Sequence, residues 1–393
     1  MSNAKSFLDR GLADTTPYPL NIEVDSACGV WINTTNNGKL FDAISGIGVS
    51  NWGHQNSVIT NLLHHQIDSS LHTMVYGEML NRNTVKAAAL LSDLLPKNLN
   101  TTYFTNSGAE AIEGALKLAK RATGRSKLIA CSGGYHGNTA GALAVSSNNE
   151  RKAPFEPLLP GVKFIDFNCS NSLNSIDAET ACVLVETVQG DAGVRIPNPY
   201  WIQELRAKCN QEGALLILDE VQCGMGRTGK PFAFEHFNVV PDILCLGKAL
   251  GGGMPIGAFV SSRDLMSQLS HSPKLGHITT FGGHPVATAG ALGALELLKE
   301  TNWSEVEAQG EYWESQLNAH PKVKSVRRIG LFMCVKMDGA DQVSKAVENG
   351  LKEGVLLFWF LSVPNAFRLS PPLNMTDAES KLGIELILKS LSF

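Results

Sequence analysis

The chain has 393 residues, of which 44% are hydrophobic and 18% are charged, and its formal net charge is −4. These values are typical of a compact globular protein of two or three domains, and they argue against a broad basic surface for nucleic acid. No apolar run approaches the roughly 18 residues of a membrane span, and no signal-type apolar core is present near the N-terminus. The eight cysteines are scattered without a C-x-x-C pair, so we expect free thiols in a reduced, cytoplasmic protein.

The first part of the chain, residues 1–47, predicts an irregular arm followed by a β-ribbon. The apolar segments Val30–Ile32 and Lys39–Phe41 flank Asn36-Asn37-Gly38, which is a strong hairpin signal. Two helices should follow over residues 56–70 and 82–96, because their apolar residues recur with helical spacing.

Residues 48–290 predict a large domain in which strands alternate with helices, the pattern of a mostly parallel sheet flanked by helices. An apolar helix over residues 285–298 should leave this domain and be buried on nearly every face. The strands of the sheet are expected at Tyr103–Thr105, Lys127–Ala130, Cys182–Val185, Leu215–Asp219, the run that ends at Lys248, and Ile256–Val260.

Residues 291–393 predict a smaller α+β domain. Its expected order is a helix, a strand at 330–335, a helix at 341–352, a strand at 355–360 and a last helix that begins with the capping box Thr376-x-x-Glu379. We expect the N-terminal ribbon to pack against these elements, so that both chain ends contribute to the small domain.

Asp219 and Lys248 each stand at the end of a buried strand, and 248 − 219 = 29 residues separate them. Ligands of open α/β sheets bind at such strand ends. Pyridoxal phosphate requires both groups, a lysine that forms a Schiff base and an acid that keeps the pyridine nitrogen protonated. Taken alone, the lysine is more often a solvated strand end, and the acid is equally suited to a cap or a salt bridge.

Three further motifs fit the same cofactor, although each also has an ordinary structural interpretation. The turn Ser107–Ala109 opens a helix and could cradle a phosphate, or Ser107 could simply cap the helix. Tyr135 and His136, among glycines, could stack on a ring or pack in the core. Arg368 could bind a substrate carboxylate or form a structural ion pair.

Two other nucleotide motifs are excluded by their context. Gly224-Met-Gly226-Arg-Thr-Gly229 matches G-x-G-x-x-G, but Lys230-Pro-Phe follows where a dinucleotide site needs a helix. A P-loop ending at Lys248 fails because Asp242 and Ala249 replace the required glycine and hydroxyl residue. A nicotinamide oxidoreductase is therefore the weakest alternative.

In combination these features resemble the class III pyridoxal-phosphate aminotransferases, the family of acetylornithine, ornithine and 4-aminobutyrate transaminases with fold type I. The most specific block is Leu218-Asp-Glu-Val-Gln-Cys-Gly-Met-Gly-Arg-Thr-Gly229, followed at the family's spacing by Gly247-Lys-Ala-Leu-Gly-Gly-Gly-Met-Pro255. The resemblance implies that Lys248 and Asp219 are catalytic. It further implies that the cofactor is contacted by Ser107, Gly108, Ala109, Tyr135, His136, Glu186, Val221, Gln222 and Thr280, the last of which reaches the phosphate of the partner subunit.

The resemblance implies a transaminase that moves an amino group from an amino acid, such as an ω-amino or ornithine-like donor, to a 2-oxo acid such as 2-oxoglutarate. It also implies a homodimer with active sites at the subunit interface and no metal. Arg368 is expected to bind substrate, and Trp52, Val75 and Tyr76 are candidates at the mouth of the site, with a core role an equal alternative for these three. The alternatives are an aminomutase or racemase, which needs no oxo acid, and a non-catalytic binding protein.

Several positions depart from the family's usual pattern. Asn138 stands where acetylornithine and ornithine enzymes usually have an arginine that holds a second carboxylate. Asp191 replaces a common glutamate, Thr187 a common proline and His284 an asparagine, and Ala109 lacks a frequent hydroxyl. These departures argue against a role restricted to acetylornithine.

Overall fold

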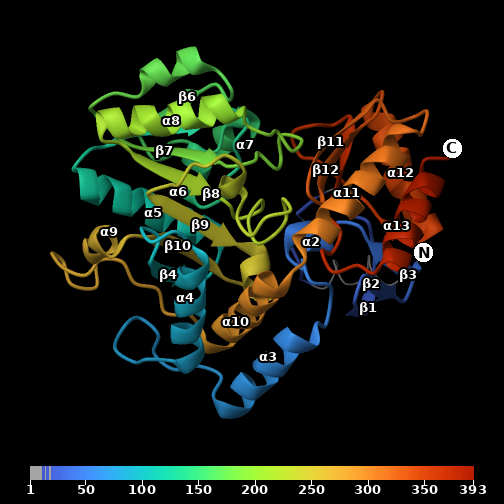
Figure 1. Ribbon diagram of the computed structural model, residues 1–393, viewed down its shortest axis with the longest axis horizontal. Coiled ribbons are helices and arrows are strands. Elements are labelled where there is room, and N and C mark those ends of the chain that lie inside the picture. The colour runs from blue at the N-terminus through green and yellow to red at the C-terminus, as the bar shows by residue number, and fades with distance from the viewer. Residues whose placement is uncertain (1–10, 14, 17–18) are drawn as a thin grey trace.

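The computed structural model describes residues 11–13, 15–16 and 19–393, and its centre is a sheet with the strand order β4-β10-β9-β8-β7-β5-β6 (Figure 1). Neighbouring strands from β9 through β6 are parallel, which confirms the mostly parallel sheet. The strands are β4 (Thr101–Thr105), β5 (Lys127–Cys131), β6 (Val162–Ile165), β7 (Thr180–Glu186), β8 (Leu215–Asp219), β9 (Ile243–Gly247) and β10 (Gly257–Ser261).

Strand β10 differs from the expectation of a parallel strand, because it runs antiparallel to both β4 and β9. Only residues 248–256 connect it to β9, and a parallel return needs a crossover of a dozen residues or more. The edge strand β6 was not predicted from the sequence. Its Lys163 and Phe164 are exposed, so the apolar run that marks an inner strand is absent there.

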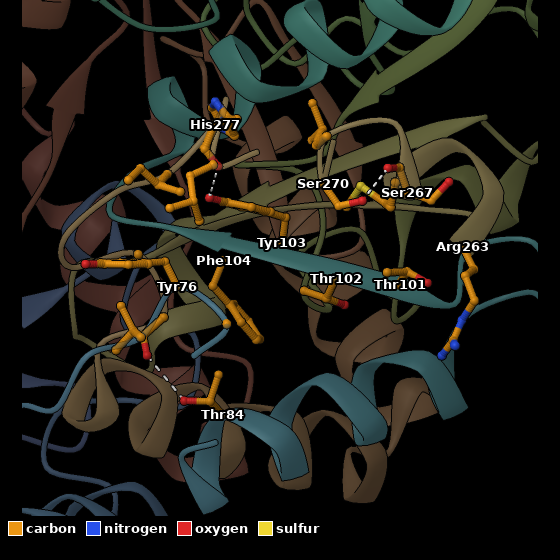
Figure 2. Close-up of a pocket in the computed structure, with 18 residues that line it drawn as sticks. Tyr76, Thr84, Thr101, Thr102, Tyr103, Phe104, Arg263, Ser267, Ser270 and His277 are labelled. Atoms are coloured by element: carbon orange, nitrogen blue, oxygen red, sulfur yellow. Dashed lines mark hydrogen bonds between the residues drawn. The ribbon is translucent and has the colours of Figure 1, made fainter. Parts of the chain in front are cut away.

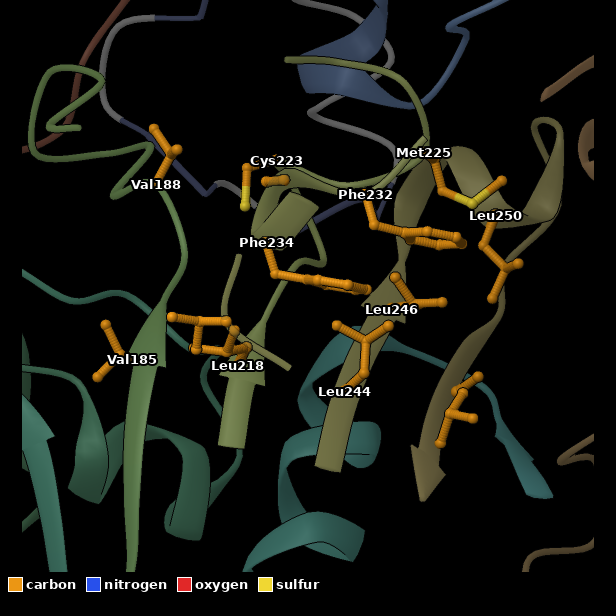
Figure 3. Close-up of a cluster of buried hydrophobic side chains, with 14 of the residues drawn as sticks. Val185, Val188, Leu218, Cys223, Met225, Phe232, Phe234, Leu244, Leu246 and Leu250 are labelled. Atoms are coloured by element: carbon orange, nitrogen blue, oxygen red, sulfur yellow. The ribbon is translucent and has the colours of Figure 1, made fainter. Parts of the chain in front are cut away.

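The inner strands are apolar without interruption because both faces of the sheet are covered. In β8, Leu216 and Leu218 belong to one hydrophobic cluster and Ile217 to the cluster on the opposite face. Figure 3 shows the first of these clusters, in which the rings of Phe232 and Phe234 lie beside the strand residues. Strands buried on both sides thus bring their C-terminal residues to one protected edge.

Helices cover the sheet, and one of them supports the chain just after Lys248. Helix α10 is buried along most of its length and packs against α3, α4 and residues 248–251, as its apolar sequence predicted. A Cβ at Gly290 would lie 2.5 Å from the carbonyl oxygen of Gly251, so only glycine permits this approach. The helices of this part are α3 (Ser57–Ser69), α4 (Arg82–Leu94), α5 (Gly108–Thr123), α6 (Ala140–Val145), α7 (Asn149–Lys152), α8 (Pro199–Glu212), α9 (Arg263–Ser267) and α10 (Pro285–Glu300), whereas the short α2 (Ser45–Gly48) lies beside the smaller sheets in Figure 1.

Two smaller sheets and three helices, α11 (Trp303–Asn318), α12 (Ala340–Glu353) and α13 (Asp377–Ser390), make up the other part of the molecule. In Figure 1 the first strands, in blue, lie beside the last helices, in red. One sheet joins β1 (Val24–Cys28), β2 (Trp31–Thr34) and β3 (Gly38–Asp42) to β13 (Val355–Leu356). The other has the order β11 (Ser325–Ile329), β12 (Phe332–Lys336), β15 (Ala366–Leu369) and β14 (Phe358–Trp359).

The N-terminal ribbon and the C-terminal segment therefore share a sheet, since Phe41 of β3 pairs with Val355 of β13. The single strand expected at 355–360 is two short strands, one in each small sheet. The boundaries at 47/48 and 290/291 stay a prediction, and α10 continues across the second. Part of the expected arm, residues 1–10, 14, 17 and 18, lies outside the described residues. Across the described ranges, no helix combines the length and apolar character needed to cross a membrane.

Candidate active site

A cavity of about 250 Å³ opens at the C-terminal ends of β7, β8 and β9. All the predicted cofactor residues except Ser107 and Thr280 line it. The lining residues are Gly108, Ala109, Tyr135, His136, Gly137, Asn138, Glu186, Asp219, Val221, Gln222 and Lys248. The structure therefore brings Lys248 and Asp219 to the wall of one cavity.

Lys248 follows β9 directly and has a backbone φ of 46°, in the left-handed region that a lysine rarely adopts. Such strain persists where the surrounding packing imposes it, and it is common at functional sites. Burial lowers the pKa of the Lys248 ammonium, while the carboxylates of Asp219 and Glu186 act to raise it. The low-dielectric surroundings thus favour the neutral, nucleophilic amine.

The carboxylate of Asp219 is held at both oxygens. Oδ1 accepts a hydrogen bond of 2.9 Å from the backbone N–H of Val221, and Oδ2 lies 2.7 Å from Nδ1 of His136. His136 is fixed in turn, because its backbone N–H donates to the hydroxyl of Ser146. The Nε2 atom of His136 is buried and has no hydrogen-bond partner among the described residues. These contacts fix the orientation of the Asp219 side chain.

Glu186 is a second buried carboxyl group beside Asp219, which is its neighbour across the β7–β8 pair. Its oxygens accept hydrogen bonds of 2.9 Å from the backbone N–H groups of Tyr135 and Gly190. Burial raises the pKa of Glu186 to about 7, and the nearby His136 opposes this rise. Glu186 therefore fixes the segment that carries Tyr135 and can change its charge near neutral pH.

Two residues that line the cavity, Val221 and Gln222, are held close to the glycines around them. A Cβ on Gly108 would lie 2.6 Å from Cγ1 of Val221, and one on Gly247 would lie 3.2 Å from the same atom. The amide Nε2 of Gln222 is buried and unpartnered within the described part of the chain. An unsatisfied donor of this kind costs free energy unless a ligand accepts from it.

Helix α5 begins at the cavity, since its first residues Gly108 and Ala109 line it. The first N–H groups of a helix have no partner within the helix, so they and the positive helix end favour an anion. Ser107 does not line the cavity. Its hydroxyl accepts a hydrogen bond of 3.2 Å from the N–H of Glu110, which is the capping role that the sequence left open.

Arg368 lies on β15 with 4% of its side chain exposed, and its NH2 group pairs with Asp191 at 3.1 Å. Asp191 also accepts hydrogen bonds from the hydroxyl of Ser362 and the N–H of Leu361. Arg368 does not line the cavity itself. Burial is the main cause that lowers the pKa of Lys248, and the positive charge of Arg368 lowers it further. A single acid, Asp191, thus balances an arginine close to the site.

Three further residues that the sequence predicted at the site do not line the cavity of their own chain. Trp52 is a core residue, 3% exposed, whose indole donates to the hydroxyl of Thr301 at 3.2 Å. Tyr76 lines a different pocket, of about 540 Å³, between β4 and the segment around His277 (Figure 2). Thr280 is exposed. The core interpretation of Trp52 agrees with its position, because a large indole next to α10 fills apolar space.

Two buried charges that hold the loop after β8 were not predicted from the sequence. Glu220 accepts hydrogen bonds of 2.7 Å from the N–H groups of both Ala233 and Phe234, and burial raises its pKa to about 7. The buried guanidinium of Arg227 donates to the carbonyl oxygens of Leu331 and Pro371. In the sequence, the position of Glu220 within the apolar segment at the end of β8 was the feature that could have indicated a buried carboxylate.

Comparison with known proteins agrees with this geometry. The chain matches the family model Aminotransferase class-III over residues 13–391. It is 37% identical over 393 residues to the acetylornithine aminotransferase of Methanopyrus kandleri, with 99% of each chain covered.

Two solved structures of the ornithine aminotransferase of Toxoplasma gondii have the same fold. One has a TM-score of 0.91 at 29% identity and covers 100% of this chain and 95% of its own. The other, described with partial occupancy of PLP at the active site, has a TM-score of 0.89 at 28% identity and covers 98% and 93%. The chain therefore belongs to the class III aminotransferases, which are enzymes that transfer amino groups with pyridoxal phosphate as cofactor.

Proposed function

We propose that this enzyme moves an amino group from an ornithine-like or other ω-amino donor to a 2-oxo acid such as 2-oxoglutarate, with Lys248 and Asp219 as the catalytic residues. The observation that carries the proposal is that both side chains line one cavity of about 250 Å³ at adjacent strand ends. The relatives named as acetylornithine and ornithine aminotransferases support the donor class.

The residues around the cavity fit pyridoxal phosphate. Val221 and Tyr135 supply faces for a ring, and the unpartnered amide of Gln222 supplies a donor for a ring hydroxyl. The open N–H groups of Gly108 and Ala109, with the positive end of α5, suit the phosphate. When bound, this cofactor supplies an electrophilic carbon and a ring that takes up electron density from the substrate.

The chain itself supplies the proton transfers. The neutral Nζ of Lys248 would take the proton from the substrate carbon that bears the amino group and would give it to the cofactor carbon to which the amino nitrogen is bonded. Asp219 keeps a proton on the pyridine nitrogen, because a fixed carboxylate stabilises the charged N–H. His136 and Glu186 position Asp219 and Tyr135.

Arg368 holds the carboxylate of at least one substrate. Its planar group can donate hydrogen bonds to two carboxylate oxygens, and Asp191 neutralises it until a substrate arrives. A carboxylate that binds there must displace Asp191 from the pair. When the end of the substrate that reaches Arg368 is uncharged or carries an ω-amino group, the Arg368–Asp191 ion pair stays intact. One site can therefore accept the amino donor and the oxo acid in turn.

The working unit we propose is a cytoplasmic homodimer in which Thr280 of each chain contacts the phosphate bound by its partner. Thr280 is exposed, and the apolar side chains of Ile278 and Phe281 beside it are 45% and 53% exposed. Large exposed apolar side chains of this kind often mark a subunit interface. All eight cysteines are free, which suits a reducing compartment.

The test is a panel of α-, β- and ω-amino acids offered to the purified holoenzyme with and without 2-oxoglutarate, with products identified by mass spectrometry. We expect ornithine or another ω-amino donor to yield a carbonyl product and glutamate, and no net reaction without the oxo acid. Repeated conversion of a donor in the absence of an oxo acid, beyond the single turnover per active site that the bound cofactor allows, would contradict the proposal and indicate an aminomutase or racemase.

A further inference from the structure

Arg151, in the short helix α7, is a half-buried arginine at the edge of the cofactor cavity that pairs with none of the acids the structure describes. Its guanidinium carbon lies 6.0 Å from the ring centroid of Tyr135. Its side chain forms no hydrogen bond or ion pair with any residue that the structure describes. By contrast, Arg368 has Asp191 and Arg206 has Asp242. Arg151 is thus a guanidinium beside the site whose donors are not used by any described side chain.

The spaces around Arg151 connect it to the cavity through Asn138. Arg151 and Asn138 both line a cavity of about 20 Å³ together with Tyr135 and Asp191, and both line an open groove of about 610 Å³. Asn138 and Tyr135 also line the cofactor cavity. The three spaces therefore meet at Asn138, and a substrate that extends past Tyr135 would meet Arg151.

We propose that Arg151 binds the second carboxylate of a dicarboxylic substrate whose first carboxylate is held by Arg368. This inference rests on the function proposed above. The planar guanidinium fork matches a carboxylate, and none of the described acids, including Asp191 and Glu150 in the adjoining spaces, forms an ion pair with it. The substrate's own charge then supplies the missing partner of Arg151.

Two neighbours support this assignment. The amide of Asn138 donates to the hydroxyl of Tyr135 at 3.2 Å, and both side chains border the cofactor cavity as well as the small space beside Arg151. Burial raises the pKa of the Tyr135 phenol, and Arg151 is the strongest influence that lowers it. The field of Arg151 thus reaches the wall of the cofactor cavity, where it would act on a bound anion.

The adjacent Lys152 provides a matched control. Its ammonium donates to the carbonyl oxygen of Ala144 at 3.0 Å and lies 4.6 Å from the ring of Phe164. It lines neither of the two spaces that Arg151 lines. The same change of charge at Lys152 therefore alters the helix without altering the proposed contact.

The experiment compares wild-type holoenzyme with Arg151→Gln, Arg151→Lys and Lys152→Gln. Calorimetry gives the dissociation constants of glutarate, a dicarboxylate, and butyrate, a monocarboxylate, and kinetics give KM for 2-oxoglutarate and pyruvate. We expect Arg151→Gln to weaken glutarate binding and raise KM for 2-oxoglutarate by roughly ten- to a hundredfold, since a charge-assisted bond is lost. Butyrate and pyruvate should be unaffected, Lys152→Gln should resemble wild type, and Arg151→Lys should fall between.

Unchanged glutarate binding in Arg151→Gln would overturn the assignment, and so would an equal loss for glutarate and butyrate. Wild-type enzyme that binds glutarate through Arg151 but forms no amino product from any donor and oxo acid would instead contradict the proposed function. The binding and turnover measurements thus separate the two claims.

Discussion

Asp219 and His136 lie 2.7 Å apart, from Oδ2 to Nδ1, in surroundings that exclude solvent. The contact ties the acid at the end of β8 to the segment that carries Tyr135. A carboxylate fixed in this way cannot turn away when its charge is needed, so the position of the acid is set before any ligand binds.

Replacement of Asp219 by Asn should lower kcat by roughly a hundred- to a thousandfold, because an amide does not stabilise a proton on the pyridine nitrogen. Steady-state kinetics of the holoenzyme measure the effect. His136→Gln, which leaves the carboxylate in place, should have a smaller effect, of roughly tenfold. An Asp219→Asn enzyme with wild-type kcat would show that the acid has another role.

Replacement of Arg368 by Gln should raise KM for 2-oxoglutarate by roughly ten- to a hundredfold, because the carboxylate loses a charge-assisted hydrogen bond. The KM of a donor amine without a carboxylate should change little, and it serves as the internal control. If both substrates lose affinity equally, then the substitution has disturbed the cavity as a whole, and Arg368 does not recognise a carboxylate.

Glu186 should make the stability of the cofactor-free protein depend on pH. Burial raises its pKa from the ordinary value of 4.5 to about 7, so the folded state binds a proton more readily than the unfolded state. The stability that this provides is complete below pH 4.5 and is lost as the pH rises through about 7. It amounts to at most about 3 kcal/mol.

Thermal unfolding of the wild type and Glu186→Gln between pH 5 and pH 8 tests this dependence. The wild type should lose Tm relative to the variant as the pH rises, since glutamine does not titrate. The variant should also have a lower Tm at pH 5, because its amide cannot accept both N–H groups that Glu186 accepts. A difference in Tm that is constant across the range would contradict the raised pKa.

Gly108→Ala should weaken cofactor binding by roughly tenfold, because the new Cβ would lie 2.6 Å from Cγ1 of Val221 and displace it from the cavity. The double variant Gly108→Ala/Val221→Ala removes the clashing methyl groups and should recover part of the affinity. Equilibrium titration of the cofactor-free protein with pyridoxal phosphate measures both. An unchanged single variant would show that the packing of Val221 does not shape the site.

Much of the fold and the site could be predicted from the sequence, because in those segments the local pattern of apolar and polar residues determines where each residue lies in the structure. The run Leu215–Asp219 is apolar on both faces, which identified an inner strand and the acid at its end. Thr376 and Glu379 form the expected capping box of α13. Lys248 was predicted by the same reasoning as Asp219 and lies in the same cavity.

The remaining features depend on contacts between distant segments. The direction of β10 follows from a connection that is too short for a crossover, and the division of residues 355–360 follows from pairing with β3. Arg151 has no local signature, because its position relative to Tyr135 arises from the fold of the loop between them. Likewise, periodicity does not distinguish an indole in the core, such as Trp52, from one at the mouth of a site.

The most direct test of the central claim is to identify the lysine that holds the cofactor. Borohydride reduction of the holoenzyme makes the link permanent, and peptide mass spectrometry then locates it. We predict a single modified peptide that contains Lys248, and a Lys248→Ala protein that is colourless, unmodified and without measurable turnover. A cofactor attached to a different lysine, or full activity in Lys248→Ala, would contradict the account.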